Sequence, residues 1–138
     1  MNQLNLNKNN MDIKDIKFKA KRLDNGEWVE GDLKHSTSYV GIGYPSSAFP
    51  DVPIVHRIDP ETVCQFTGLK DCEGNEIWEN DILLNVTDDS PDGIVVFRYG
   101  AFCLLAKNNR DFCVALTYLL SNKKVLNRFK VVGNKFDN

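Results

Sequence analysis

Apolar and polar residues alternate in short runs along most of the chain, and glycine, asparagine and aspartate separate the runs. The first clear run is Ile16–Lys21, in which every second residue is apolar, as in a half-buried strand. Asp24-Asn25-Gly26 follows and tolerates the positive φ angles of a tight hairpin turn. Because the chain then returns through another apolar run, Asp15–Leu33 is predicted to form a β-hairpin with Trp28 as its anchor.

The same reasoning predicts strands along the rest of the sequence. They are Tyr39–Ile42, Val55–Ile58, Phe66–Leu69 and Glu76–Trp78 around a turn at Asp71–Asn75, Ile82–Val86, Ile94–Tyr99 paired with Ala101–Ala106, and Phe129–Asn134. The proline-containing stretch Gly43–Pro53 is predicted to be a loop or an edge segment, and Thr87–Gly93 is predicted to be a loop. Leucines at helical spacing predict a short helix or helical turn near Leu116–Ser121.

Many short strands with at most one short helix indicate a mostly β fold. A small closed barrel suits this pattern because closure removes the exposed edge strands that promote aggregation. The passage from Asn80-Asp81-Ile82 through a polar loop into Ile94–Phe97 is similar to the opening of SH3-like barrels. We therefore expect a flexible polar tail at 1–11, an N-terminal β-rich region containing the hairpin at 12–58, and an SH3-like β-barrel at 59–138.

Composition narrows the possible partners. The 138 residues are 42% hydrophobic and carry a net charge of −2, which fits a globular domain able to bury its own core. No apolar run approaches the ~20 residues that cross a bilayer, so no membrane partner is expected. Acids dominate residues 61–95, and bases dominate residues 97–138. This asymmetry is either a nucleic-acid face or two halves that pair with each other; the net negative charge favours the second interpretation.

The four cysteines invite a zinc or disulfide interpretation, but Cys64, Cys72, Cys103 and Cys113 include no C-x-x-C pair. The asparagine-rich start has no apolar segment typical of a secretory signal, so a reducing compartment is expected, in which disulfides are rare. Free, structural cysteines are therefore favoured. His35 and His56 are isolated and fit no metal-binding motif.

The stretch Asp59–Leu83 holds the densest polar pattern in the chain. Its candidate binding residues are Gln65, Thr67, Lys70 and Asp71. In one interpretation its carboxylates hold a metal, or Lys70 and Asp71 form an acid–base pair. In the other, which we favour, the polar side chains shape turns and satisfy backbone groups. No catalytic motif, phosphate loop or dinucleotide fingerprint is present, so no catalytic residue, metal or cofactor is predicted.

Phe97, Tyr99 and Phe102 surround Gly100, with Arg98 between the first two. Aromatic residues interleaved with bases are typical of stacking platforms for single-stranded nucleic acid. Alternation also places Phe97 and Tyr99 on one face, where they would fill a barrel interior. We favour the core interpretation.

Three places in the chain resemble the YopX-like family of phage and prophage proteins: Ile16–Ala20 with the hairpin that reaches Gly31-Asp32-Leu33, the stretch Asp59–Leu83, and the end of the chain at Val131–Asn134. Val63–Asp71 is similar to its V-G-Q-F-T-G-L-K-D pattern, Gly74–Ile82 to G-K-E-I-Y-E-G-D-I, and Val131–Asn134 to V-I-G-N. The chain departs from the family at Cys64 and Asn80, where glycine is common. The resemblance implies an SH3-like barrel, a phage or prophage origin and a bacterial cytoplasm; it supplies no catalytic residues.

The leading hypothesis is a non-enzymatic binding module that docks a partner during phage growth or prophage maintenance. The acidic pI favours a protein partner over nucleic acid. One alternative is a small metal-dependent enzyme or enzyme inhibitor that uses the acidic residues of Asp59–Leu83, a stretch that we call the signature. The other is a structural subunit of a larger assembly. Some self-association into a homo-oligomer is also expected.

Overall fold

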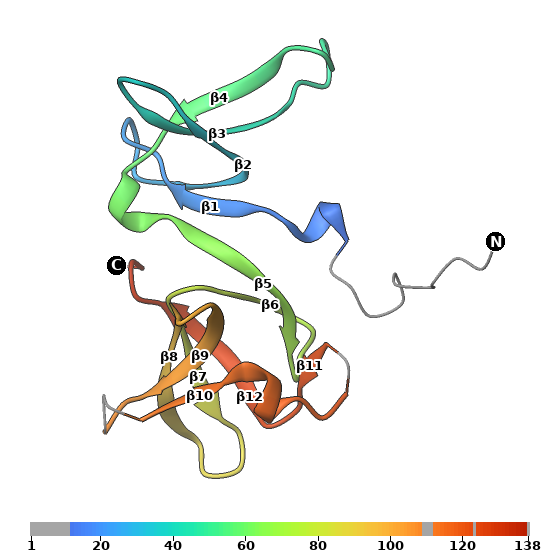
Figure 1. The fold of residues 1–138 in the computed structure, drawn as a ribbon, viewed down its shortest axis with the longest axis vertical. Coiled ribbons are helices and arrows are strands. Elements are labelled where there is room, and N and C mark those ends of the chain that lie inside the picture. Colours follow the sequence, from blue (N-terminus) through green and yellow to red (C-terminus); the bar gives the residue numbers. More distant parts are fainter. Residues whose placement is uncertain (1–11, 109–111, 123, 138) are drawn as a thin grey trace, which may run out of the picture. The chain divides into compact units, whose positions relative to one another are not determined.

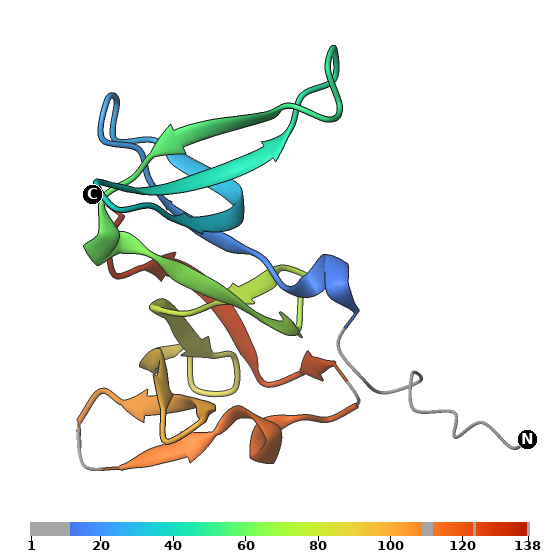
Figure 2. The same cartoon turned by 45° about the horizontal axis from the view of Figure 1, so that its top comes forward.

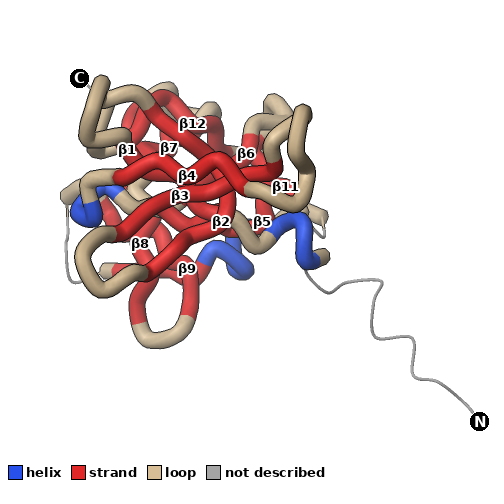
Figure 3. The backbone as a smooth tube through the Cα atoms, turned by 90° about the horizontal axis from the view of Figure 1, so that it is seen from above, coloured by secondary structure: helices blue, strands red, loops and turns tan. Residues whose placement is uncertain are grey.

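The computed structural model describes residues 12–108, 112–122 and 124–137, and strands are their main secondary structure (Figures 1 and 3). The predicted tail at 1–11 lies outside them. The only helices in the described ranges are three short 3-10 turns, η1, η2 and η3, at Ile13–Asp15, Pro60–Thr62 and Leu116–Leu119. The mostly β prediction is therefore confirmed. No described helix is long or apolar enough to cross a membrane.

The described chain divides into two compact units, residues 13–66 and residues 67–137. We call them the N-terminal unit and the C-terminal unit. Strand β5 (Cys64–Asp71) begins in the first unit and ends in the second.

The N-terminal unit is an antiparallel sheet in the order β5-β1-β2-β3-β4 (Figure 2). The strands are β1 (Phe18–Lys21), β2 (Trp28–His35), β3 (Val40–Pro45) and β4 (Pro53–Arg57). The β1–β2 pair is the hairpin that the sequence predicts. Lys19 and Lys21 lie over the Trp28 ring, with ammonium-to-centroid distances of 4.7 and 5.5 Å, so this half-buried tryptophan organises one face of the hairpin.

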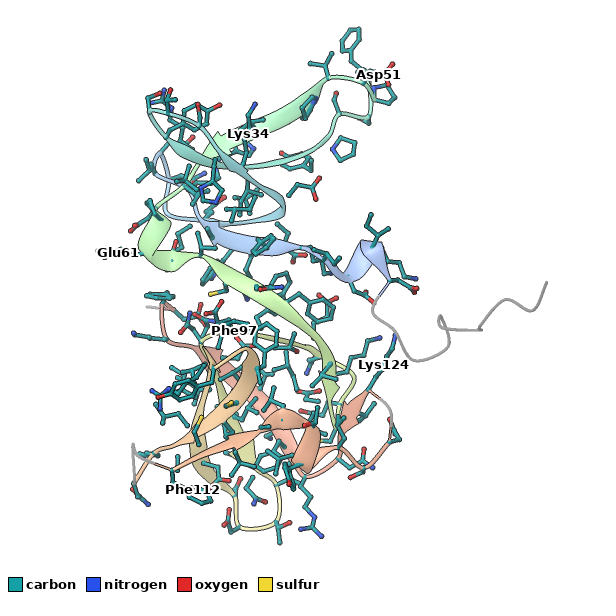
Figure 4. The ribbon with its side chains drawn as sticks, viewed as in Figure 1. Lys34, Asp51, Glu61, Phe97, Phe112 and Lys124 are labelled. Atoms are coloured by element: carbon teal, nitrogen blue, oxygen red, sulfur yellow. The ribbon has the colours of Figure 1, made fainter. Side chains whose placement is uncertain are left out.

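Residues 46–52 of the proline-containing stretch form the loop of the β3–β4 hairpin, and Pro53 begins the edge strand β4, in agreement with the prediction of a loop or an edge segment; residues 43–45 belong to β3. Pro45 and Pro53 stand opposite each other where the paired region ends. Proline lacks an amide hydrogen and is tolerated at strand ends, so the prolines bound the hairpin instead of abolishing it. Figure 4 places Asp51 at its tip.

The core of the N-terminal unit is small. Its fully buried residues are Ala20, Ile42 and Ile58, with partly buried neighbours packed around them. The end of β4 and the residues just after it also connect to the first hairpin, because the Leu23 amide donates to the Arg57 carbonyl and the Asp59 amide donates to the Lys21 carbonyl, at 3.1 and 2.8 Å.

The C-terminal unit contains the end of β5, which pairs with β6 (Glu76–Trp78) and, in parallel, with β11 (Val125–Leu126). It also contains a five-stranded sheet in the order β10-β9-β8-β7-β12 (Figure 1). The sheet strands are β7 (Asp81–Asn85), β8 (Ser90–Arg98), β9 (Ala101–Ala106), β10 (Cys113–Ala115) and β12 (Phe129–Asn134).

One face of the five-stranded sheet supplies the core of this unit. Leu83, Val95 and Leu104 are buried on it and pack with residues of the other strands and of η3; the further buried members are Ile77, Leu116, Leu126 and Phe129. The predicted helical turn near Leu116 is η3, and it contributes its first residue to this core. No closed barrel is found in the described residues, so the SH3-like part of the fold prediction is not confirmed.

Strand β8 is longer than the sequence indicates, because it begins at Ser90 inside the predicted loop 87–93. A β-bulge between Leu83 and Leu84 shifts the register, so that Pro91 stands opposite Leu84. Bulges accommodate a proline within a ladder, which explains why a proline-containing segment joins this strand.

The core interpretation of the aromatic cluster is wrong for two of its three residues. Phe102 packs against the core, but Phe97 is 52% exposed and Tyr99 is fully exposed. Tyr99 and Gly100 have φ angles of +54° and +80° and form the tight turn between β8 and β9, so the alternation ends before Tyr99. Phe97 pairs with Phe102 edge to face at 5.0 Å between ring centroids, and Figure 4 labels it.

Candidate functional site

Thr67 and Asp71, two of the four predicted binding residues, are buried in the C-terminal unit. The Thr67 hydroxyl donates to the Ile77 carbonyl at 2.6 Å and accepts from the Leu69 amide at 3.1 Å. These bonds join β5 to β6 and leave no hydroxyl on the surface.

Asp71 is fully buried at the end of β5. Its Oδ1 accepts the amides of Glu73 and Asn75 at 2.9 and 2.8 Å, which shapes the β5–β6 turn. Its Oδ2 accepts the Val131 amide at 2.9 Å and the Asn75 side-chain amide at 3.3 Å. The Asp71 carboxylate thus takes the place of a neighbouring strand as the acceptor for the Val131 amide of β12.

The other two predicted residues lie apart from this network. Lys70 is exposed; it stands opposite Val125 in the parallel pair, and its backbone amide donates to the Lys124 carbonyl at 2.7 Å. Gln65 is half-buried in the N-terminal unit, opposite Phe18. The structure therefore does not bring the four residues together as one exposed cluster.

A second signature carboxylate, Asp81, is also buried. It accepts the Trp78 amide at 2.7 Å and the Asn134 side-chain amide at 2.9 Å. The same Asn134 nitrogen lies 3.2 Å from the Glu79 carbonyl. Asp71 and Asp81 therefore hold β12 near its middle and at its end. Within residues 12–108, 112–122 and 124–137, no three His, Cys, Asp or Glu side chains gather in a way that could hold a metal ion.

The outer face of the five-stranded sheet, opposite its core face, carries a groove of about 570 Å³. Its floor is apolar and half-buried. It is lined by Asn80, Ile82, Gly93, Ile94, Val96, Leu105, Ala106, Lys107 and Lys135. We call this the outer groove.

Strand register explains the floor. Ile94 stands opposite Ile82 on one side and opposite Leu105 on the other, so three large apolar side chains form a row across β7, β8 and β9. Val96 points to the same face, two residues further along β8. When only one face of a strand is covered, the residues on the other face are normally polar. The apolar residues of the outer groove depart from this pattern.

The charged residues of the outer groove are both lysines. The Lys107 amide donates to the Asp92 carbonyl at 3.0 Å, and the Lys135 amide donates to the Asn80 carbonyl at 2.8 Å. Both side chains are exposed, and neither ammonium forms an ion pair with a described residue. Among the described residues, no acid lines the outer groove.

Sequence reasoning missed the outer groove because its lining comes from four separated segments. Alternation identifies the two faces of each strand, but here both faces of β8 are apolar. The run Ile94–Phe97 was the available signal, since four successive apolar residues indicate a strand covered on both sides. The sequence does not say which face would remain uncovered.

All four cysteines are free thiols, in agreement with the sequence interpretation. Cys103 and Cys113 lie on neighbouring strands, with Cys113 opposite Leu105 and Cys103 opposite Ala115. Burial, together with the hydrogen bond between the two thiols, raises the pKa of Cys103.

We expect iodoacetamide to modify Cys72 first, because this thiol is exposed in the β5–β6 turn. Cys64 and Cys103 should react last because both are buried from the reagent, and the raised pKa of Cys103 further reduces its thiolate at pH 8. Mass spectrometry of time-quenched digests measures the order. The modification rate of each thiol is compared with its rate in urea-unfolded protein. Equal rates for all four thiols in the native protein would contradict the described burial.

The structure defines a mostly β protein of two units, whose C-terminal unit carries an apolar groove between two lysines. The model of the YopX protein family matches residues 3–138, so the chain belongs to this family. A comparison with curated proteins gives no match.

Proposed function

We propose that the protein is a non-enzymatic binding module that docks a segment of a partner protein in the outer groove. The main supporting observation is that the apolar floor is only partly buried, although it lies on the central strands of the sheet. Exposed apolar surface of this kind marks sites that a partner covers.

The chemistry of the outer groove favours protein over nucleic acid. Its floor consists of aliphatic side chains, whereas single-stranded nucleic acid is bound by aromatic stacking. Phosphate binding also depends on many basic contacts, and two lysines on a protein of net charge −2 provide few. Aliphatic side chains of a partner would instead be desolvated against Ile82, Ile94 and Leu105.

The proposal includes an SH3-like arrangement of the C-terminal unit. Strands β7 to β10 follow one another as an antiparallel meander, η3 comes next, and β12 returns to pair with β7. This order supports an SH3-like relationship. The signature aspartates serve the binding surface indirectly, because they hold β12, and β12 leads directly into Lys135.

The proposed setting is a phage or prophage protein acting in the bacterial cytoplasm, which is what the resemblance to the YopX-like family implies. Self-association would compete with partner binding, because a second copy of the chain would have to cover the same apolar floor. Size-exclusion chromatography with light scattering distinguishes a monomer from a homo-oligomer.

Selection from a displayed library of random 12-residue peptides tests the proposal. We expect binders to the wild-type protein whose affinity falls at least tenfold when Ile94 and Val96 are both changed to threonine. Threonine retains the β-branched shape and strand propensity while it removes apolar surface worth about 1 kcal/mol per side chain. Fluorescence anisotropy measures the affinity.

Tyr118→Thr is the matched control, because Tyr118 is 85% exposed in η3 and is not part of the outer groove. Melting temperatures of all variants confirm that they fold. Peptides that bind the double variant as tightly as the wild type would overturn the proposal. Retention of DNA or RNA in mobility-shift assays at low salt, reversed by the same double variant, would replace the protein partner with nucleic acid.

A further inference from the structure

We infer that the outer groove selects a segment that carries two carboxylates about 17 Å apart, with apolar side chains between them. This inference rests on the proposed function and adds the chemistry of the occupant. It follows from the positions of Lys107 and Lys135, from the apolar row between them and from the charge balance of the C-terminal unit.

The two lysines are tied to different points along β8. Lys107 is held by the Asp92 carbonyl, whereas Lys135 is held by the Asn80 carbonyl, and the Asn80 amide donates to the Val95 carbonyl at 2.7 Å. Asp92 and Val95 are three residues apart on one strand. At ~3.3 Å per residue this gives about 10 Å along the strand direction. Lys107 continues β9 and Lys135 continues β12, which are three strand spacings or about 14 Å apart across the sheet, so the two backbone positions are about 17 Å apart.

The apolar row lies within this interval. Ile94, between Asp92 and Val95 in β8, carries Ile82 and Leu105 as its cross-strand neighbours. An occupant that satisfies both lysines must therefore cross the row, and its side chains over the row must be apolar to avoid burying unpaired polar groups.

Charge complementarity with the two lysines indicates that the groups flanking the apolar part of the occupant are negatively charged. Residues 67–138 contain nine Lys or Arg and ten Asp or Glu, so the unit as a whole is not basic. The two ammonium groups beside an apolar floor are thus a local feature. An amphipathic segment with carboxylates would pair with both, and the apolar floor would screen those pairs from water on one side.

The spacing distinguishes backbone conformations. In an extended segment, residues about five apart span this separation. In a helix, about eleven residues are needed to cover the same length. The spacing of the two acids in a bound segment therefore reports its conformation.

The experiment uses the 12-residue peptides selected on wild-type protein. We expect pairs of Asp or Glu that enclose apolar residues, about five residues apart in an extended segment or about eleven apart in a helix. Changing both Lys107 and Lys135 to glutamate should weaken these peptides at least tenfold, and the wild-type affinity should fall as salt rises. Peptides whose two acids are replaced by lysine should regain affinity for the double glutamate variant.

The matched control changes Lys124 and Arg128 to glutamate; both are exposed, neither lines the outer groove, and Figure 4 labels Lys124. The control should bind within twofold of wild type. If the threonine double variant loses binding while the Lys107 and Lys135 reversal does not, the carboxylate inference fails and the proposed function stands. If neither variant loses binding, both fail. Selected peptides whose acids stand at neither spacing would also overturn the inference.

Discussion

Asp71→Ala is expected to unfold the C-terminal unit or to lower its free energy of unfolding by about 3–5 kcal/mol. The substitution leaves the Glu73, Asn75 and Val131 amides without their acceptor. Each buried donor that loses its partner costs about 1–3 kcal/mol, because water cannot replace the lost bond without opening the site. The β5–β6 turn and the attachment of β12 are therefore lost together.

Urea unfolding measures this effect unit by unit, because each unit contains one tryptophan. Trp78 is 4% exposed in the C-terminal unit, so its fluorescence reports that unit in a Trp28→Phe background. Glu73→Ala is the matched control, since it removes an exposed carboxylate from the same turn; its effect should stay within about 0.5 kcal/mol. An Asp71→Ala midpoint equal to that of the control would refute the structural role.

Asp71→Asn refines the interpretation. The amide oxygen can still accept from the turn amides of Glu73 and Asn75, but its nitrogen then faces the Val131 amide, donor against donor. The expected loss lies between those of the control and of alanine, and hydrogen exchange should be fastest at Val131. Uniform protection along β12 would argue against an attachment through this carboxylate.

Local sequence chemistry predicted much of the fold because it acts over a few residues. The first hairpin follows from alternation and from Asn25-Gly26, and Gly26 has a φ of +72°. A turn at 71–75 was predicted, with polar side chains shaping it, and Asp71 and Asn75 both take part in its hydrogen bonds. Asn80, which replaces a glycine common in the family, has a φ of +70°, as its tolerance of left-handed angles allows.

The candidate site was harder to predict because it depends on contacts between distant segments. Asp71 is bound to Val131, sixty residues away, and nothing near Asp71 in the sequence indicates that its second oxygen is used there. Lys107 and Lys135 looked like parts of a diffuse basic end. Only the register of β7, β8 and β9 shows that they enclose an apolar floor.

The polar signature and the outer groove are connected through β12. Asp81 and Asn134 bind each other at 2.9 Å, and Asn134 is followed directly by Lys135. Asn80, beside Asp81, holds the Lys135 amide through its carbonyl. A network that resembled an active site thus fixes one wall of a surface groove, which is why buried aspartates can serve binding without touching a ligand.

Gly93→Ala is expected to cost the C-terminal unit about 3 kcal/mol or more. A Cβ at Gly93 would lie 2.2 Å from the Leu105 carbonyl oxygen and 3.0 Å from its carbon. Those atoms belong to the backbone of the paired strand, so no side chain can rotate away and β8 must separate from β9. Since Gly93 and Leu105 both line the outer groove, the floor would be disturbed as well.

Gly133→Ala in β12 is the matched control within the same sheet. The nearest atom to its added Cβ is Asp137 Oδ2 at 3.8 Å, an ordinary contact, and the smaller entropy of the unfolded chain should make the change neutral or slightly stabilising. Thermal unfolding compares the two variants, and hydrogen exchange locates the damage, with loss of protection expected first in β8 and β9. Equal melting temperatures for Gly93→Ala and Gly133→Ala would show that the close approach of β8 to β9 does not constrain position 93.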